Sequence, residues 1–491
     1  MVIIYFLLRI ILYDIILIIK SFSCIGGIAA VKKHYIFLFF VIALSLFASC
    51  KNNSSFNAKN PITLTIWHNY GGQMKNTMDE MIDDFNRTIG HEKGIILNVT
   101  SISGSAYLQE KLLMIVNGDP DAPNLPDITT CYPGTASKLY EKGMLSDIGT
   151  LFNKNELSEY IPEYIEEGRL KDEKLYVFPV AKSTEVMFVN ATIFNRFMRD
   201  NDVSYEDLKT FEGINKAAEL YYDWTDNMTP DIKNDGKTFI VYDSIFNLAQ
   251  IGLEQLGESL TNGDSLNFSS SSLKKVWNIY FEPAVKGYAA IFDGYGSDLS
   301  KTGDAVCSIG STAGVLFYPS TITYDDNVTE AVEYIVLPYP VFKGGKNVAI
   351  QRGSGMCVAK STHEKEYAAG IFLKWFTSPE QNLRFIASTG YLPVTKKAFE
   401  KIMSEDCSII ANDKIKKLIS AEKLMYADYD FYIPPVIDNI DAIQKKYDAS
   451  VKEHAKKSRK LYIEYINSMD RNKAFERASE NTFFDFVKNQ R

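Results

Sequence analysis

The sequence predicts an α/β protein built of two lobes, and two observations lead to this fold class. With 491 residues, the chain exceeds the about 250–300 residues at which a single hydrophobic core stops growing. Its first globular segments alternate between strand-like and helix-like patterns, an order typical of parallel sheets covered by helices. We therefore expect two lobes, each a mainly parallel sheet with helices on its faces.

The predicted elements of the first lobe follow the two periods of regular secondary structure. Strand-like runs are short and rich in β-branched residues, while helical segments place apolar residues three or four positions apart. We predict strands over residues 63–67, 95–99 and 127–130, and helices over residues 74–85, 107–115 and 135–142. Ligands of such sheets lie beyond the carboxyl ends of the strands, so residues 68–70, 103–107 and 131–134 are expected at the mouth of one cleft.

The composition is that of a globular protein with an excess of negative charge. Hydrophobic residues make up 46% of the chain and charged residues 23%, and the net charge is −8. A nucleic-acid partner would normally need a basic surface, so this charge argues against one. The later cysteines follow no compact spacing. We expect buried thiols, and no disulfide framework, at Cys131, Cys307, Cys357 and Cys407.

Residues 1–49 are predicted to be a leader that is removed on export. Lys32 and Lys33 precede an apolar run over residues 35–47, and two small residues follow, which is the pattern of a secretory signal. The run is shorter than the about 20 residues that a membrane span needs. Export to the periplasm or the cell exterior is therefore expected.

Cys50 follows the small residues directly and resembles the lipidated cysteine of bacterial lipoproteins, although Phe47 stands where Leu is usual. Acyl chains on Cys50 would anchor the protein to a membrane, with residues 50–60 as lipidated cysteine and polar tether. The alternative is a free cysteine behind a plain signal peptide. Residues 1–30 form a second apolar stretch, which we interpret as an extension upstream of a true start at Val31. A real additional membrane helix is the other interpretation.

Seven short motifs occur in order along the mature chain. They are Leu64–Trp67, Asp84–Asn86, Pro126–Ile128, Phe178–Asn190, Ser311–Gly314, Thr377–Glu380 and Thr389–Thr395. In this order they resemble the bacterial family 1 extracellular solute-binding proteins, which include the maltose- and glycerol-3-phosphate-binding proteins. The resemblance implies a periplasmic-binding-protein-like fold with the ligand between two lobes. It also implies a monomeric binding protein, without catalytic residues, cofactor or metal, that works with an ABC permease.

The resemblance divides the chain between the lobes. Lobe one would comprise residues 60–180 and 353–396, and lobe two would comprise residues 181–352 and 397–485. Closure of a hinge around the solute would be the functional motion. A transporter recognises the closed form. Capture therefore depends on how much more tightly the closed form binds the solute than the open form does.

Motif positions and strand ends select the residues expected to hold the solute. A sugar offers hydroxyl groups, which need hydrogen-bond partners, and apolar ring faces, which pack on aromatic rings. The expected ligand-binding residues are His68, Tyr107, Tyr132, Ser183, Asp243, Phe246, Ser311, Thr312, Gly353, Ser354 and Tyr391. Gly353 and Ser354 would contribute backbone N–H groups, because glycine permits close approach.

The ligand and the function class each have a rival. The Gly390–Pro393 segment looks closest to the glycerol-3-phosphate-binding branch, which favours glycerol 3-phosphate or a glycerophosphodiester. Asp243 would repel a phosphate but accept hydrogen bonds from sugar hydroxyls, so we predict a neutral carbohydrate. An exported glycoside hydrolase is the rival from another class, since carboxylates are abundant, although the motifs of metalloproteases and serine hydrolases are missing from the sequence. A purely structural lipoprotein would bind no small solute.

Overall fold

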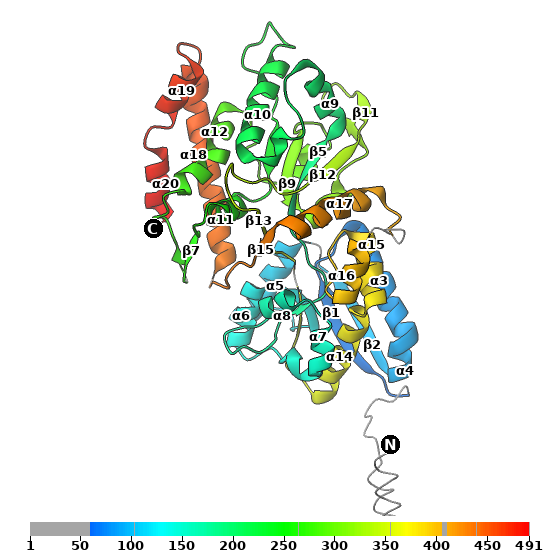
Figure 1. Cartoon of the computed structure of the whole chain (residues 1–491). Helices are drawn as coiled ribbons and strands as arrows, with labels where there is room; N and C mark the ends of the chain where they lie inside the picture. Colours follow the sequence, from blue (N-terminus) through cyan, green and yellow to red (C-terminus); the bar gives the residue numbers. More distant parts are fainter. Residues whose placement is uncertain are drawn as a thin grey trace, which may run out of the picture. The chain divides into compact units, whose positions relative to one another are not determined.

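The computed structural model describes residues 59–102, 104–263, 265–353, 355–404, 410–437 and 439–490. Residues from Ala58 onward form one compact unit, drawn in Figure 1. Its first elements follow the predicted alternation. They are β1 (Ile62–His68), α3 (Gly72–Phe85), β2 (Ile95–Ser101), α5 (Ser105–Asn117), β3 (Ile128–Cys131) and α6 (Pro133–Glu141).

Two larger sheets and their covering helices make up the rest of the fold. The other strands of these sheets are β4 (Phe178–Pro179), β5 (Glu185–Asn190), β6 (Ile240–Tyr242), β9 (Cys307–Ser311), β12 (Tyr334–Leu337) and β14 (Gly355–Val358). Short two-stranded pairs are formed by β7 (Thr261–Asn262) with β8 (Ser265–Leu266), β10 (Thr321–Thr323) with β11 (Thr329–Ala331), and β13 (Val348–Ile350) with β15 (Asp430–Tyr432). The longer helices after α6 are α9 (Ala191–Asp200), α10 (Phe211–Asp226), α11 (Ile245–Gln255), α12 (Leu273–Lys286), α14 (His363–Phe376), α15 (Pro379–Thr389), α17 (Asp413–Asp428) and α18 (Ile440–Tyr465). Shorter helices are α4 (His91–Lys93), α7 (Lys154–Ser158), α8 (Pro162–Glu167), α13 (Gly296–Leu299), α16 (Lys396–Met403), α19 (Arg471–Ala478) and α20 (Thr482–Gln490).

Both large sheets are mixed, but all strands except one run in the same direction in each, so the predicted α/β class with mainly parallel sheets is confirmed. The first sheet has the order β2-β1-β3-β14-β4, in which β14 runs antiparallel to both of its neighbours. The second has the order β12-β5-β9-β6, in which β5 runs antiparallel to both of its neighbours and β6 pairs in parallel with β9. The two reversed strands, β14 and β5, have their physical reason in the connections between the sheets. Strands β4, β5 and β14 adjoin short crossing segments, and a strand entered in this way need not run parallel, unlike one reached by a helical crossover.

Three crossing segments run side by side between the two sheets. Ser183 and Arg352 exchange backbone hydrogen bonds of 2.9 and 2.7 Å, and Lys182 pairs in the same way with Leu392. The hydroxyl of Thr184 also donates to the carbonyl of Ile350 at 2.7 Å. All strands of the first sheet come from residues 60–180 and 353–396, and those of the second from residues 181–352. The exact lobe boundaries stay a prediction.

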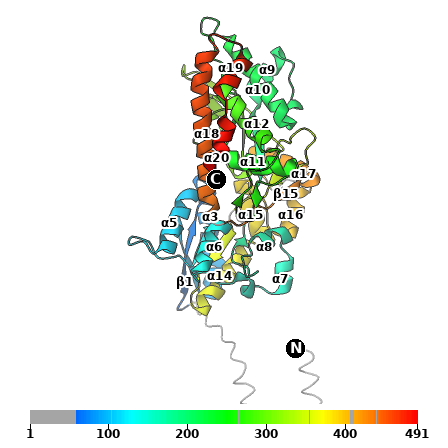
Figure 2. The same ribbon diagram turned by 90° about the vertical axis from the view of Figure 1, so that its left-hand side faces the viewer.

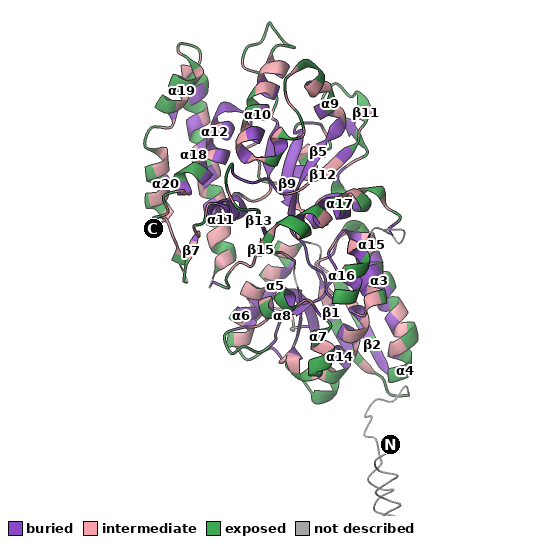
Figure 3. Cartoon of the chain, viewed as in Figure 1, coloured by how far each residue is buried: buried purple, intermediate pink, exposed green. Residues whose placement is uncertain are grey.

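Each large sheet contributes to an apolar core, and β9 and β5 of the second sheet are coloured as buried in Figure 3. In the first sheet β3 is buried throughout, and in the second β5 is. The continuous apolar run of β5 is typical of a strand covered on both faces. Cys131, Cys307 and Cys357 are free and buried, as predicted, while Cys407 lies outside the described residues.

The C-terminal helices pack on the second sheet's helices. In Figure 2, α18, α19 and α20 stand together beside α12. Their apolar contact is aromatic: the ring of Trp277 stacks on Phe281 at 3.7 Å and lies 6.0 Å from Phe486 of α20. Among the described helices, none is both long and apolar enough to cross a lipid bilayer.

Candidate functional site

The carboxyl ends of strands from both sheets carry polar residues. In the first sheet β1 ends at His68 and β3 is followed by Tyr132. In the second sheet β6 is followed by Asp243 and β9 ends at Ser311. This is the sheet edge at which α/β proteins bind their ligands.

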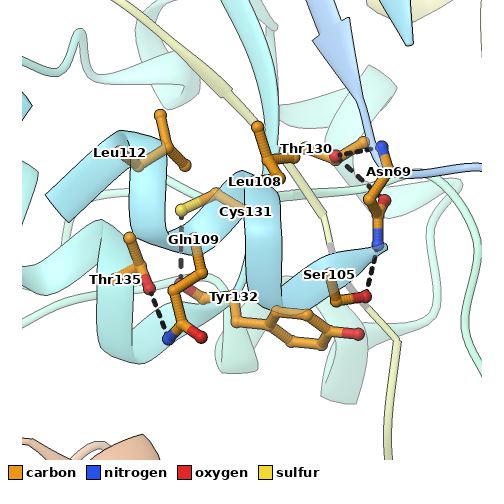
Figure 4. Close-up of a pocket in the computed structure, with 9 residues that line it drawn as sticks. All are labelled: Asn69, Ser105, Leu108, Gln109, Leu112, Thr130, Cys131, Tyr132 and Thr135. Carbon is orange, nitrogen blue, oxygen red and sulfur yellow. Dashed lines mark hydrogen bonds between the residues drawn. The ribbon is translucent and has the colours of Figure 1, made fainter. Parts of the chain in front are cut away.

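The first sheet's edge holds a small polar pocket, drawn in Figure 4. Its volume is about 10 Å³, and it lies between the ends of β1 and β3 and the first turns of α5 and α6. The amide of Asn69 donates to the hydroxyl of Ser105 at 2.6 Å and accepts from Thr130 at 3.0 Å. The pocket has room for about one water molecule. The two hydrogen bonds fix the orientation of the Asn69 side chain, because they engage both ends of its amide.

Three tyrosines gather next to this pocket. The rings of Tyr70 and Tyr391 lie 5.9 Å apart, edge to face, and Tyr132 interacts electrostatically with both hydroxyl groups. Burial raises the pKa of Tyr70 and that of Tyr391, so both remain neutral hydrogen-bonding phenols at ordinary pH. The hydroxyl of Tyr70 is buried without a hydrogen-bond partner among the described residues. Such a group favours an additional partner, since an unpaired buried hydroxyl costs free energy.

An ion pair joins the second sheet to the crossing segment. Arg352 donates to Oε1 of Glu185 at 2.7 Å, and the amide of Asn247 donates to the same oxygen at 2.6 Å. The Glu185 side chain is 2% exposed. A buried carboxylate needs such partners, because burying a charge without them is costly. The pair therefore holds the Arg352 side chain beside the strand ends.

A second buried carboxylate, Asp243, lies near this ion pair. Burial raises its pKa to about 7, while the Gly296 N–H, which donates to Asp243 at 2.7 Å, acts in the opposite direction. The negative charge of Glu185 raises this pKa further, and Arg352 lowers it. Asp243 also contacts Gly310 so closely that a methyl group there would meet its carboxylate at 2.2 Å. Near neutral pH this side chain can accept a hydrogen bond in its ionised form and donate one in its protonated form.

The sequence profile described as "Bacterial extracellular solute-binding protein" matches residues 80–415, which is more than half of the chain. The chain belongs to this family. The predicted family resemblance is thus confirmed, and membership places this solute-binding protein among exported proteins. No curated protein matches it by sequence.

Solved structures of two-lobed binding proteins share the fold. The cyclic α-maltosyl-1,6-maltose binding protein from Arthrobacter globiformis superposes with a TM-score of 0.60 at 16% identity, covering 88% of this chain and 100% of its own. An ABC substrate-binding protein from Listeria monocytogenes in complex with cycloalternan gives 0.61 at 16% identity over 88% and 99%. UgpB from Mycobacterium tuberculosis in complex with glycerophosphocholine gives 0.58 at 16% identity over 88% and 100%. At this identity the likeness establishes the two-lobed α/β fold.

The structure brings most of the predicted site residues of this solute-binding protein to one region. Tyr132, Tyr391 and Asp243 surround Arg352, as their electrostatic interactions show. The other members lie on the crossing segments and the end of β9. These are Ser183, which pairs with Arg352, Thr312, whose N–H donates to Thr184, Ser311, which caps the following helical turn, and Gly353, whose carbonyl accepts from Lys182.

Three predicted residues lie in different surroundings. The ring of Tyr107 is 52% exposed and carries the ammonium of Lys111 at 4.7 Å. The side chain of Phe246 is buried against Tyr447, with ring centroids 5.5 Å apart. His68 is fully buried beside Tyr70, and burial lowers its pKa to about 4, so its ring is neutral. Ser354 and Cys50 lie outside the described residues. The ligand contacts of all these residues stay predictions.

Sequence reasoning missed the charged centre of the site. Arg352 and Glu185 were not selected, nor was Tyr70. The signal for Glu185 was present, because it is the single charged residue of β5 and directly precedes four apolar residues. Arg352 directly precedes the selected Gly353. In the described part of the chain, no group of three or more His, Cys, Asp or Glu side chains is placed to hold a metal ion.

Proposed function

We propose that this solute-binding protein captures a neutral, carbohydrate-like solute between its lobes and delivers it to an ABC importer. The observation that carries the proposal is the polar cluster of Arg352, Glu185 and Asp243 facing the tyrosines Tyr132 and Tyr391. Charged planar side chains of both signs can donate to and accept from sugar hydroxyls, and tyrosine rings can pack on sugar ring faces. Hinge closure would bring these groups around the solute.

The charge balance of the cluster disfavours an anionic solute. Arg352 is the single cation of the cluster, and it already pairs with Glu185 at 2.7 Å. Asp243, which is partly ionised near neutral pH, lies beside it. A phosphate would have to approach the Glu185 carboxylate and the partly ionised Asp243 with one guanidinium, whereas a neutral hydroxyl meets no such repulsion. Glycerol 3-phosphate or a glycerophosphodiester is the second candidate, because UgpB in complex with glycerophosphocholine shares the fold.

We further propose that the mature protein starts at a lipidated Cys50 and is held at a membrane by this anchor. The sequence pattern before Cys50 supports this, and residues 51–60 supply a polar tether to β1. Mass spectrometry of protein from membranes would show a mature chain that begins at Cys50 with its acyl chains. Recovery of unmodified protein in the soluble fraction would contradict the anchor.

Thermal unfolding with a panel of solutes tests the ligand class. Residues 51–491 would be mixed with monosaccharides, disaccharides, oligosaccharides, polyols and glycerophosphates. A ligand of the folded state stabilises by about 2.7 kcal/mol at roughly 100-fold excess over its Kd. A dose-dependent shift with one sugar supports the proposal. A shift with glycerophosphates alone favours the second candidate, and release of product sugars would indicate a glycoside hydrolase.

Matched variants locate the site. Tyr391→Ala and Arg352→Ala should remove the ligand-induced shift, because each removes a member of the cluster. Phe484→Ala is the control, since Phe484 is an aromatic side chain of α20 that is 67% exposed. A shift retained in both cluster variants would contradict this location of the site.

A further inference from the structure

A second cavity lies at the end of the second sheet opposite to the polar cluster. Its volume is about 590 Å³, within the range of small-molecule sites. It is bordered by α9, α10 and the loop after α10, together with Gly303 and Tyr324. Lys237 precedes β6 and Gly303 precedes β9, whereas Asp243 and Ser311 lie at the other ends of these strands. Figure 1 shows α9, α10 and β11 grouped at this end of the sheet. We call this space the outer cavity.

Aromatic rings line one wall of the outer cavity and are held rigidly. Tyr221 is 3% exposed, and its ring meets Phe197 edge to face at 5.3 Å. Trp224 lies 5.8 Å from Tyr221, and its indole N–H donates to Asp200 at 3.1 Å. The buried Tyr221 supports the partly exposed ring of Trp224, and a fixed ring offers an apolar surface at little cost in side-chain entropy. The wall therefore suits a planar or ring-shaped ligand.

Charged side chains of both signs border the same cavity without pairing. Arg199 and Lys237 are cations, and Asp200 and Asp235 are carboxylates. Among the described residues, none of these four belongs to an ion pair within 4.0 Å. The carboxylates instead accept from neutral donors, as Asp235 does from Thr229 at 2.7 Å, and the ammonium of Lys237 lies over the Tyr324 ring at 5.9 Å.

Arg196, the remaining cation that borders the outer cavity, is paired within the described residues, unlike Arg199 and Lys237. Arg196 is fully engaged, because its guanidinium binds both carboxylate oxygens of Glu330, at 3.1 and 3.0 Å, and the hydroxyl of Tyr324 at 3.1 Å. It therefore serves as a wall of the cavity. The four unpaired charges sum to zero, and a neutral molecule that carries one charge of each sign would complement them.

We propose that the outer cavity binds a small zwitterion with a ring, of the chemical class of the aromatic α-amino acids. The ring lies against Trp224, the ligand carboxylate binds Arg199 and Lys237, and the ligand ammonium binds Asp200 and Asp235. This site is independent of the interlobe cleft and of its solute. It gives the protein a second ligand, bound on the outer side of one lobe.

Titration calorimetry with three related compounds tests the ligand class. L-phenylalanine carries the ring and both charges, L-phenylalaninamide lacks the carboxylate, and N-acetyl-L-phenylalanine lacks the ammonium. Phenylalanine should bind, and each analogue should bind about tenfold more weakly, because each loses one charge-assisted contact. Absence of phenylalanine binding at about millimolar concentration overturns the proposal. Equal binding of the three compounds overturns it as well.

Variants of exposed residues locate the binding event without risk to folding. Lys237→Gln and Asp235→Asn should each weaken phenylalanine binding about tenfold, with unchanged thermal midpoints in the absence of ligand. Lys233→Gln, an exposed cation of the same loop that does not border the cavity, is the matched control. Binding that survives in both cavity variants but is lost in Tyr391→Ala would place phenylalanine in the cleft and overturn the proposal. The sugar screen is read separately, so failure of one site leaves the other testable.

Discussion

At the scale of single residues, Lys182 is the most deeply buried cation of the crossing segments. Its ammonium lies 2.7 Å from Glu167, and the two side chains are 4% and 12% exposed. The amide of Gln351 donates to the same carboxylate. Lys182→Met should destabilise the protein by about 3–5 kcal/mol, because it leaves a buried carboxylate without its counter-charge. Urea unfolding measures this difference.

A double-mutant cycle separates the lost charge pair from lost packing. Adding Glu167→Gln to Lys182→Met removes the unpaired charge while keeping a polar side chain of the same shape. The double variant should therefore be more stable than Lys182→Met alone. Additive costs of the two substitutions would show that the ion pair contributes nothing beyond packing.

The buried carboxylate of Asp243 predicts how stability depends on pH. Its pKa is about 7 in the folded protein and about 3.9 in an unfolded chain. Between these values the folded state binds more protons, so the free energy of unfolding falls as pH rises from about 4 to 7 and then levels off. Asp243→Asn should reduce the loss of stability between pH 5 and pH 8, by on the order of 1–3 kcal/mol.

The comparison for this prediction is Asp448, another carboxylate with a raised pKa. Burial raises the pKa of Asp448 to about 6, so its contribution is lost at lower pH than that of Asp243. In urea unfolding of Asp448→Asn, the slope of the unfolding free energy against pH should therefore differ from that of the parent mainly between about pH 4 and 6. An unchanged pH profile in Asp243→Asn would contradict the assignment of the effect to that residue.

At the scale of elements, the crossing segments depend on Gly353. Its φ is +107°, and a methyl group there would lie 2.7 Å from the carbonyl oxygen of Ala181 and 2.9 Å from the Cα of Lys182. Both contacts are to backbone, which cannot yield without separating the segments. Gly353→Ala should cost at least about 2 kcal/mol more than a glycine substitution with left-handed strain alone.

Gly143→Ala supplies that reference. Gly143 has a φ of +66°, and a methyl group there would meet nothing within 4 Å. Its substitution should cost about 1 kcal/mol, since only the backbone strain applies. Equal destabilisation of the two variants, measured by urea unfolding, would show that the close approach at Gly353 carries no energetic weight.

The elements also show where sequence reasoning succeeds and where it stops. The strands and the longer helices up to α6 were predictable, because periodicity is a local property: β1 was expected over 63–67 and spans Ile62–His68. The direction of β14 was not, because its partner β3 lies more than 200 residues earlier in the chain. The same reason explains why Arg352 was missed. Its partner Glu185 is 167 residues away, and no local pattern reports such a pair.

At the scale of the whole molecule, α18 connects helices that belong to the two sheets. Near its start, Asn439 accepts from Lys138 of α6 at 2.9 Å, and Asp441 accepts from Gln109 of α5. Further along, Gln444 donates to Ser244 at 3.1 Å, and Asp448 accepts from the N–H of Phe246 at 2.7 Å, at the start of α11. One rigid helix thus bonds to the first sheet's helices and to α11 of the second.

These contacts are expected to favour the closed arrangement of the lobes before any solute binds. Gln109→Ala combined with Lys138→Ala removes both hydrogen bonds from the first sheet's helices to α18 while leaving those to the second intact. The open form should then be more populated, since each hydrogen bond is worth about 0.5–1.5 kcal/mol. The radius of gyration from small-angle scattering should increase without ligand, and solute affinity should fall by about tenfold, because a smaller fraction of molecules is competent to bind.

Lys457→Ala is the control, since Lys457 lies on α18 with its side chain 70% exposed and pairs within the helix with Glu453. If the double variant keeps the parent radius and affinity, α18 does not couple the lobes, and closure must be driven by the solute alone.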